Sequence, residues 1–240
     1  MEQNQVDIVM TSYYRPHFTA QCLEAIDKYT KYPHRVILID NGSDRETTDY
    51  LWDAWEHNTI NLLILLDKNY GLEPAKNKAL PFVRSDLYVD TDNDIIVNDY
   101  GSDCWLTRLV GLMNRNKGYA AISSTPQVFI GADKSEMFKD ADEVVERDFV
   151  GGSMRIMRTD AVKEVEGWRE EPKDMVEANR GEEHYICGKL KKEGWKVGYA
   201  RDVECQHLFG SDNWGYKKET EHYHRDQWPI PTDEMYGKKA

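Results

Sequence analysis

The stretch V-D-I-V-M-T-S-Y-Y-R-P, residues 6–16, sets the pattern of the first hundred residues. Its apolar start, residues 6–10, has the composition of a strand, and Pro16 then opens a segment whose apolar side chains recur at helical spacing. Further strand-like runs lie at residues 35–39, 62–66 and 87–89, with helical segments between them. Strands that alternate with helices in this way predict an α/β fold with a mostly parallel sheet covered on both faces.

The remaining secondary structure is predicted from capping signals and apolar spacing. Ser43 and Glu46 have the spacing of a capping box, which predicts a helix start there, and residues 71–82 predict the next helix. Later helices are expected at residues 105–113, 159–165 and 182–193, and later strands at 119–123, 197–199 and 203–205. The acidic stretch 133–148 predicts a mobile loop, and the sequence is irregular and aromatic after residue 210.

The composition of the 240-residue chain limits the class of protein. Its formal net charge of -12 argues against broad electrostatic adhesion to nucleic acid or anionic lipid, which relies on clustered Lys and Arg. The four cysteines form no C-x-x-C pair, so neither a zinc knuckle nor a disulfide framework is indicated. The N-terminus has no signal-peptide pattern, and no run approaches the roughly 20 apolar residues of a membrane helix. We therefore expect a soluble protein of a reducing, cytoplasmic compartment, with no membrane span.

Three carboxylates alternate in Asp90-Thr91-Asp92-Asn93-Asp94, directly after the fourth strand-like run. Carboxylates this close repel one another unless a cation lies between them. A solvated acidic turn or a structural calcium loop would be the simpler interpretations. An EF-hand loop that began at Asp90 would need Gly at its sixth position and Glu at its twelfth. Those positions hold Ile95 and Gly101. The cluster therefore indicates a metal and phosphate site of another kind.

Several motifs, in this order, resemble the family 2 glycosyltransferases of GT-A fold. They are V-D-I-V-M-T-S-Y-Y-R-P, I-L-I-D-N-G-S, N-Y-G-L-E-P-A-K-N-K-A-L, D-T-D-N-D, V-G-G-S-M, G-E-E-H-Y-I-C-G-K-L-K-K-E-G-W-K-V and E-C-Q-H. The resemblance covers about residues 6–210 and implies a Rossmann-like three-layer sandwich. It also implies one GT-A domain at residues 1–210, with a nucleotide-sugar-binding half at 1–100 and an acceptor and catalytic half at 101–210. Residues 211–240 would form an irregular C-terminal extension.

The resemblance implies which residues hold the nucleotide sugar. Thr11, Tyr13 and Arg15 match the family's first loop, which holds the base and phosphates of the donor. Asp40 matches the carboxylate that hydrogen-bonds a uracil-type base, although Asp at this place also favours a simple Asx turn before a helix. Lys76 lies where the family places a basic residue near the donor, and it could equally be a solvated charge on a helix.

The resemblance also implies a divalent metal, Mn²⁺ or Mg²⁺. Two D-x-D patterns overlap, Asp90 to Asp92 and Asp92 to Asp94, and the second runs straight into an apolar stretch as the family's motif does. Asp94 would bind the metal, Asp92 would contact the ribose or the metal, and Asn93 would join the donor-binding residues. His207 matches a late histidine that binds the metal in some members, while a lone histidine after a strand is more often structural. Carboxylates with an imidazole suit Mn²⁺, and phosphate oxygens make Mg²⁺ workable.

The resemblance also implies that the sugar is transferred with inversion at its anomeric carbon. Such a transfer requires a base that takes the proton of the acceptor hydroxyl. The family usually has Glu-Asp at the start of a late helix, where this chain has Glu182-Glu183, so Glu183 occupies the position of the base. At 100° per residue Glu183 is expected on the apolar face of the helix, and Glu182 on its flank. Both glutamates could instead simply complement the helix dipole.

The sequence thus predicts a metal-dependent inverting glycosyltransferase that moves a sugar from a nucleotide donor, a UDP-sugar, to an acceptor hydroxyl. A sugar nucleotidyltransferase is the first alternative, although that family opens with a Gly-rich phosphate loop where this chain has T-S-Y-Y-R. The second is a non-catalytic nucleotide- or carbohydrate-binding domain. The acceptor is left open among a glycan, a lipid-linked sugar, a protein and a modified nucleic-acid base.

Overall fold

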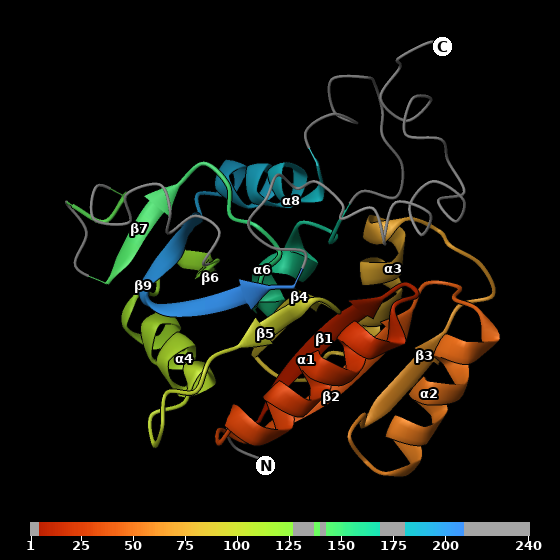
Figure 1. Ribbon diagram of the computed structural model, residues 1–240. Coiled ribbons are helices and arrows are strands. Elements are labelled where there is room, and N and C mark those ends of the chain that lie inside the picture. Colours follow the sequence, from red (N-terminus) through yellow and green to blue (C-terminus); the bar gives the residue numbers. More distant parts are fainter. Residues whose placement is uncertain (1–4, 127–136, 140–142, 169–180, 209–240) are drawn as a thin grey trace, which may run out of the picture.

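The computed structural model describes residues 5–126, 137–139, 143–168 and 181–208 (Figure 1). The strands are β1 (Val6–Ser12), β2 (His34–Asp40), β3 (Leu62–Leu65), β4 (Leu87–Asp92), β5 (Ile95–Val97), β6 (Tyr119–Pro126), β7 (Val144–Arg147), β8 (Arg155–Arg158) and β9 (Lys196–His207). The helices are α1 (Pro16–Tyr29), α2 (Arg45–Glu56), α3 (Leu72–Ala79), α4 (Trp105–Arg115), α6 (Thr159–Glu164) and α8 (Gly181–Lys192), with a 3₁₀ turn, η1, at Leu80–Phe82. The extension expected at residues 211–240 and the start of the acidic stretch lie outside the described residues.

The strands form one nine-stranded sheet in the order β3-β2-β1-β4-β8-β6-β9-β5, with β7 paired to β9. β1 pairs in parallel with both β2 and β4, and β2 pairs in parallel with β3. β6 and β9 are parallel as well, while β8 is inserted antiparallel between β4 and β6. The predicted α/β fold with a mostly parallel sheet is confirmed.

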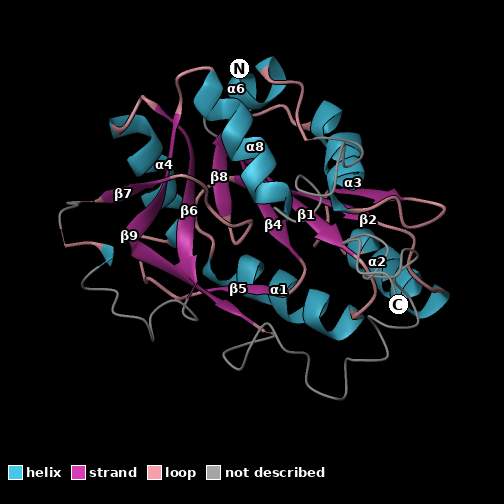
Figure 2. Cartoon of the chain, turned by 90° about the horizontal axis from the view of Figure 1, so that it is seen from above, coloured by secondary structure: helices cyan, strands magenta, loops and turns pink. Residues whose placement is uncertain are grey.

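Two helical layers cover the sheet, as Figure 2 shows for β1 and β4, which lie between α1 and α8. Apolar side chains of α1, α2 and α4 form one buried cluster with one face of the strands. Those of α3, α6 and α8 form a second cluster with the other face. No helix in the described ranges is long and apolar enough to cross a membrane. The alternation of strand side chains between two cores explains why the strands read as continuous apolar runs.

Tertiary pairing changes several predicted elements. The two strands expected at residues 197–199 and 203–205 form one strand, β9, because β6, β7 and β5 pair along its length. β7 lies in the stretch predicted to be a mobile loop, so that prediction is wrong for Val144–Arg147. These residues pair with β9 through backbone hydrogen bonds, which an acidic composition does not prevent. The short strands β5 and β8 were not predicted.

The start of α2 also differs from the predicted capping box. Asp44, not Ser43, is the N-cap residue, and its side chain accepts a hydrogen bond from the Thr47 N–H at 3.0 Å. Ser43 is used elsewhere, because its hydroxyl donates to the Asp40 carboxylate and accepts from the Tyr14 N–H. The serine therefore joins the loops after β1 and β2 instead of capping the helix.

Candidate donor, metal and catalytic site

The carboxyl ends of β1, β2 and β4 meet at one edge of the sheet. Ser12, last in β1, is paired with Asp40, last in β2, and Thr11 is paired with Asp92 at the end of β4. The strand order reverses here, because β2 lies on one side of β1 and β4 on the other. Open α/β sheets bind ligands at such a reversal. The structure therefore brings predicted donor residues from distant parts of the sequence to one place.

The loop after β1 directs Arg15 toward the acidic cluster. Tyr14 and Arg15 have left-handed backbone conformations, with φ of 53° and 59°. Non-glycine residues adopt this conformation where their surroundings hold it, and here the Tyr14 N–H donates to Ser43 Oγ at 2.7 Å. Arg15 donates from Nη1 to Asp94 Oδ2 at 3.0 Å and from Nη2 to Asn93 Oδ1 at 3.1 Å. A guanidinium thus lies at the predicted phosphate site.

Asn93, which was predicted to bind the nucleotide sugar, stabilises the loop after β1. Its amide donates to the Tyr14 carbonyl at 3.1 Å and to Thr19 Oγ1 at 2.9 Å. Its carbonyl oxygen accepts from Arg15, and the residue is 1% exposed. Asn93 therefore positions the loop that carries Arg15, and its side chain is committed to the protein.

Asp40 forms the Asx turn that was one of its two predicted roles. Its Oδ2 accepts from the Ser43 N–H at 2.8 Å, and its Oδ1 accepts from the Ser43 hydroxyl. Burial raises the pKa of Asp40, which is 0% exposed. Thr11 is also buried, and its Oγ1 has no hydrogen-bond partner among the described residues. Tyr13 is half-buried nearby. Thr11 thus has a hydroxyl oxygen without a described partner, whereas Asp40 presents no exposed surface to a nucleobase.

Asp94 and His207 are brought together by strand pairing. The residue after Asp94, Ile95, pairs with His207 where β5 runs antiparallel to β9. His207 Nε2 lies 3.7 Å from Asp94 Oδ1. That oxygen is buried, and no hydrogen-bond donor reaches it in the described part of the chain. A buried carboxylate oxygen without a donor is costly unless a cation compensates its charge.

Asp92 carries uncompensated charge beside Asp94. Burial raises the pKa of Asp92 to about 7, the neighbouring Asp94 and Asp90 raise it further, and Lys76 opposes them. We find no hydrogen bond to its carboxylate from any described residue. Within the described ranges no three His, Cys, Asp or Glu residues stand close enough to hold a metal by themselves. A metal held by Asp92, Asp94 and His207 therefore stays a prediction, and it would need further ligands such as phosphate oxygens.

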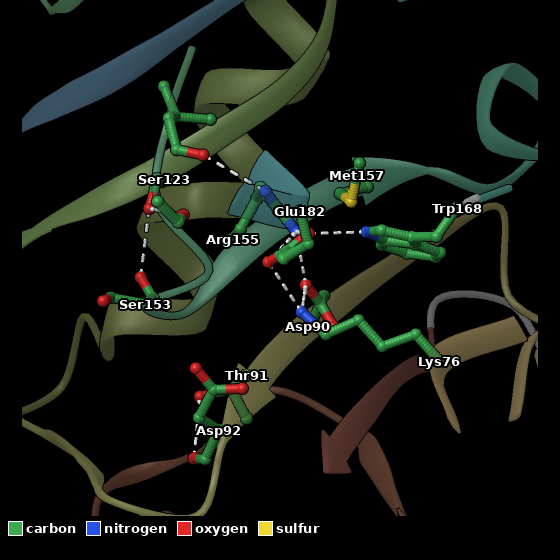
Figure 3. A network of polar contacts seen from close by, with 12 residues as sticks. Lys76, Asp90, Thr91, Asp92, Ser123, Ser153, Arg155, Met157, Trp168 and Glu182 are labelled. Carbon is green, nitrogen blue, oxygen red and sulfur yellow. Dashed lines mark hydrogen bonds and ion pairs between the residues drawn. The ribbon is translucent and has the colours of Figure 1, made fainter. Parts of the chain in front are cut away.

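Asp90, unlike Asp92 and Asp94, belongs to a buried ion-pair network. Its members are Lys76, Asp90, Arg155 and Glu182, and we call it the Lys76 network (Figure 3). Lys76 Nζ lies 2.9 Å from both Asp90 Oδ2 and Glu182 Oε1. Arg155 Nη2 lies 2.6 Å from Asp90 Oδ2 and 3.2 Å from Glu182 Oε2. Two cations therefore balance two carboxylates. Lys76 is 1% exposed, so the interpretation as a solvated helix charge is wrong.

Two members of this region could not be assigned from the sequence. Arg155 was missed because it belongs to the short strand β8, and its one signal is an arginine inside the apolar run V-G-G-S-M-R-I-M. Trp168, whose indole N–H donates to Glu182 Oε2 at 2.7 Å, has no sequence signal that distinguishes it from the other tryptophans of the chain. Both contacts depend on chain segments that meet only in the fold.

The orientation predicted for the two glutamates of α8 is wrong. Glu182 is 7% exposed and lies in the Lys76 network, whereas Glu183 is half-buried. Helical phase counts the apolar residues of later turns, but the first turn borders two buried cations that attract the Glu182 carboxylate. Burial alone would raise the pKa of Glu182, but Arg155 and Lys76 lower it to about 2.

Glu183 folds back over the start of its own helix. Gly181 has φ of 72°, and a Cβ added there would lie 2.7 Å from Glu183 Oε2. The left-handed backbone favours glycine at this position, and the Glu183 carboxylate lies against it. No ion pair or hydrogen bond from the described residues engages Glu183, so its carboxylate is available to a ligand.

Comparison with known proteins places this chain in a family. The model of the family described as "Glycosyl transferase family 2" matches residues 7–166. The O-antigen chain rhamnosyltransferase RfbN of Salmonella typhimurium is 22% identical over 91% of this chain and 70% of its own length. A UDP-Gal:alpha-D-GlcNAc-diphosphoundecaprenol beta-1,3-galactosyltransferase of Escherichia coli is 27% identical over 51% of this chain and 44% of its own.

Solved structures share the fold. A mannosyltransferase from Pyrobaculum calidifontis in complex with GDP-Man and Mn²⁺ superposes with a TM-score of 0.69, at 16% identity over 89% of this chain and 59% of that chain. S. aureus TarS in complex with UDP-GlcNAc has a TM-score of 0.64, at 15% identity over 92% of this chain and 64% of that one. This chain spans less than two thirds of both, and the likeness confirms the GT-A fold. The chain belongs to glycosyl transferase family 2.

Proposed function

We propose that the protein transfers a sugar from a nucleotide donor, a UDP-sugar, to an acceptor hydroxyl with inversion at the anomeric carbon. The observation that carries this proposal is the pairing of Arg15 with Asp94 beside the uncompensated Asp92, at the strand reversal of the sheet. Cationic and metal-binding groups gathered at such a reversal suit a nucleoside diphosphate. The nucleotide sugars named for two of the structural relatives, and the Mn²⁺ named for the first of them, support the same class of ligand.

Asp92, Asp94 and His207 would hold Mn²⁺ or Mg²⁺ together with the diphosphate. When bound, the cation stabilises the negative charge that develops on the departing diphosphate. Arg15 contributes a second positive group, since its guanidinium already lies at Asp94 and can donate to phosphate oxygens. Thr11, whose hydroxyl has no partner among the described residues, and Tyr13 would contact the nucleoside.

Glu183 would take the proton of the attacking acceptor hydroxyl. Its carboxylate is half-buried at the start of α8 and is free of the Lys76 network that holds its neighbour ionised. A general base must be able to accept a proton and reach the reacting hydroxyl, and Glu182 meets neither condition. The names of the two curated relatives favour a glycan or a lipid-linked sugar as acceptor over a protein or a nucleic-acid base.

We also infer a reducing, cytoplasmic location for this domain. Its four cysteines, Cys22, Cys104, Cys187 and Cys205, are buried free thiols. Such residues behave as small apolar side chains and are common where disulfides do not form.

The test is turnover of a donor panel. With Mn²⁺ and a suitable UDP-sugar, we expect the protein to release UDP, slowly by hydrolysis when no acceptor is present. Glu183→Gln should keep donor binding and lose transfer by about 100- to 10,000-fold, the usual contribution of a general base. Asp49→Asn, an exposed carboxylate on α2, is the control and should match the wild type. Release of pyrophosphate from UTP and a sugar phosphate would instead indicate a nucleotidyltransferase, and failure to bind any nucleotide sugar would contradict the proposal.

A further inference from the structure

The Lys76 network joins four parts of the chain that lie far apart in sequence. Lys76 comes from α3, Asp90 from β4, Arg155 from β8 and Glu182 from α8. Lys76 and Asp90 belong to the predicted donor half, and Arg155 and Glu182 to the other half. All four are at most 7% exposed. The network therefore joins β4, which ends at Asp92, to the first turn of α8, the helix that carries Glu183.

The charges of the network balance only when all four side chains are present. A buried ion without its partner costs several kcal/mol, so each member depends on the other three. Both carboxylate oxygens of Glu182 are used, Oε1 by Lys76 and Oε2 by Arg155 and the Trp168 indole. Glu182 is thus fixed from three directions, which leaves its side chain a single orientation.

The network also touches the proposed donor site through a glycine. A Cβ added to Gly152 would lie 3.1 Å from Glu182 Oε1, 3.5 Å from Lys76 Nζ and 3.8 Å from Asp92 Oδ2. The backbone of the loop between β7 and β8 therefore closes directly over the point where the network and Asp92 approach each other. Displacement of the Glu182 carboxylate would therefore change its contact with the backbone of this loop.

We propose that Glu182 is a positioning residue that holds the first turn of α8, and with it Glu183, against the carboxyl end of β4 through Lys76 and Arg155. Glu183 is the next residue along the helix, so the anchor fixes its backbone within one residue. The inference rests on the proposed function for the role of Glu183 as the base. It gives the paired glutamates different tasks, one as an anchor within the Lys76 network and the other in the chemistry of transfer.

The test compares Glu182→Gln with the wild-type protein in two measurements. In transfer assays we expect kcat to fall by about 100-fold, the effect of a misplacement near 1 Å, while the KM for the donor changes less than about twofold. In hydrogen exchange we expect amides of residues 183–186 to lose protection, because the first turn of α8 is released.

Asp7→Asn is the matched control. Asp7 is 2% exposed and forms a buried ion pair with Arg35, at 2.7 Å, in the first half of β1 and away from α8. We expect this variant to lower stability without changing kcat or the exchange of residues 183–186. If Glu182→Gln does not fold, the double variant Lys76→Met/Glu182→Gln removes one charge of each sign and should show the same loss of protection.

The outcomes separate this inference from the proposed function. Unchanged kcat and unchanged exchange in Glu182→Gln would overturn it, as would equal loss of protection in Asp7→Asn. A parallel rise in the donor KM would assign Glu182 to donor binding instead and also overturn it. If the wild type turns over no donor, the proposed function fails, while the exchange measurement still decides whether Glu182 anchors the helix.

Discussion

Two neighbouring regions of the molecule use the same residue type in opposite ways. In the Lys76 network, Asp90 and Glu182 are buried with two cations, and the charges cancel. A few residues on, Asp92 has no hydrogen-bond donor among the described residues, and Asp94 keeps one buried oxygen unused. The first region pairs each carboxylate with two cations, although Asp90 Oδ1 and Arg155 Nε have no hydrogen-bond partner among the described residues. In the second region Asp94 pairs with Arg15, and Asp92 forms no ion pair with a described cation. Charge compensation, and not the acidic motif itself, therefore distinguishes the structural carboxylates from those of the candidate site.

The largest expected difference between the two regions concerns stability. Asp90→Asn leaves two buried cations with one carboxylate and should lower the free energy of unfolding by about 3–5 kcal/mol. Asp92→Asn removes a charge that burial and like-charged neighbours disfavour, so it should be neutral or stabilising by up to about 1 kcal/mol. Urea unfolding of both variants measures the two changes. Equal destabilisation would show that the carboxylates do not differ as the comparison requires.

A pH titration sharpens the comparison, with a somewhat smaller effect. The pKa of Glu182 is lowered from its ordinary value of 4.5 to about 2. A lowered folded-state pKa means that the contribution of Glu182 is fully present above pH 4.5 and is lost as the pH falls toward 2. The contribution is about 3 kcal/mol. We expect the acid unfolding limb to become shallower in Glu182→Gln.

The control for this titration is Asp148→Asn. Asp148 also pairs with a lysine of α8, Lys191 at 2.5 Å, but its side chain is 95% exposed. Exposed pairs contribute little to stability, so this variant should keep the wild-type acid limb. An unchanged limb in Glu182→Gln would contradict the role of the network in stability.

The smallest expected effect comes from the two arginines. The Arg15 side chain is 15% exposed and pairs with one carboxylate of the candidate site, so Arg15→Gln should cost about 2 kcal/mol, as for a hydrogen bond to a charged group. Arg155→Gln should cost more, about 3–5 kcal/mol, because that side chain is 0% exposed and bridges two carboxylates. Thermal unfolding of the pair measures the difference. Similar losses would place Arg15 in the structural framework too.

Much of the fold was accessible from the sequence because local patterns are strong in its first half. Strands such as β1 and β2 are buried on both faces, so their apolar runs are continuous and are followed by amphipathic helices. Short strands such as β5, with three residues, carry no periodicity and exist because β9 pairs with them. The sheet order of the second half therefore could not be predicted.

The site was only partly predictable for a related reason. Motif order predicted Arg15, Asp92 and Asp94 as site residues, and all three follow strands that the sequence reveals. The partners of Glu182 could not be predicted, because Lys76 and Arg155 reach it from segments that meet only in the fold. Helical phase then assigned the buried orientation to the wrong glutamate. Long polar side chains follow their charged partners more closely than the apolar stripe of their helix.

The central claim is that Asp92 and Asp94 of the second region bind a nucleoside diphosphate together with a divalent cation. Calorimetric titration of UDP tests it most directly, with Mn²⁺ and with EDTA, on the wild type, Asp94→Asn and the control Asp49→Asn. We predict binding by the wild type and Asp49→Asn that requires Mn²⁺, and an affinity at least about 10-fold weaker in Asp94→Asn. Equal UDP affinity in Asp94→Asn, or equal affinity with and without Mn²⁺, would contradict the claim.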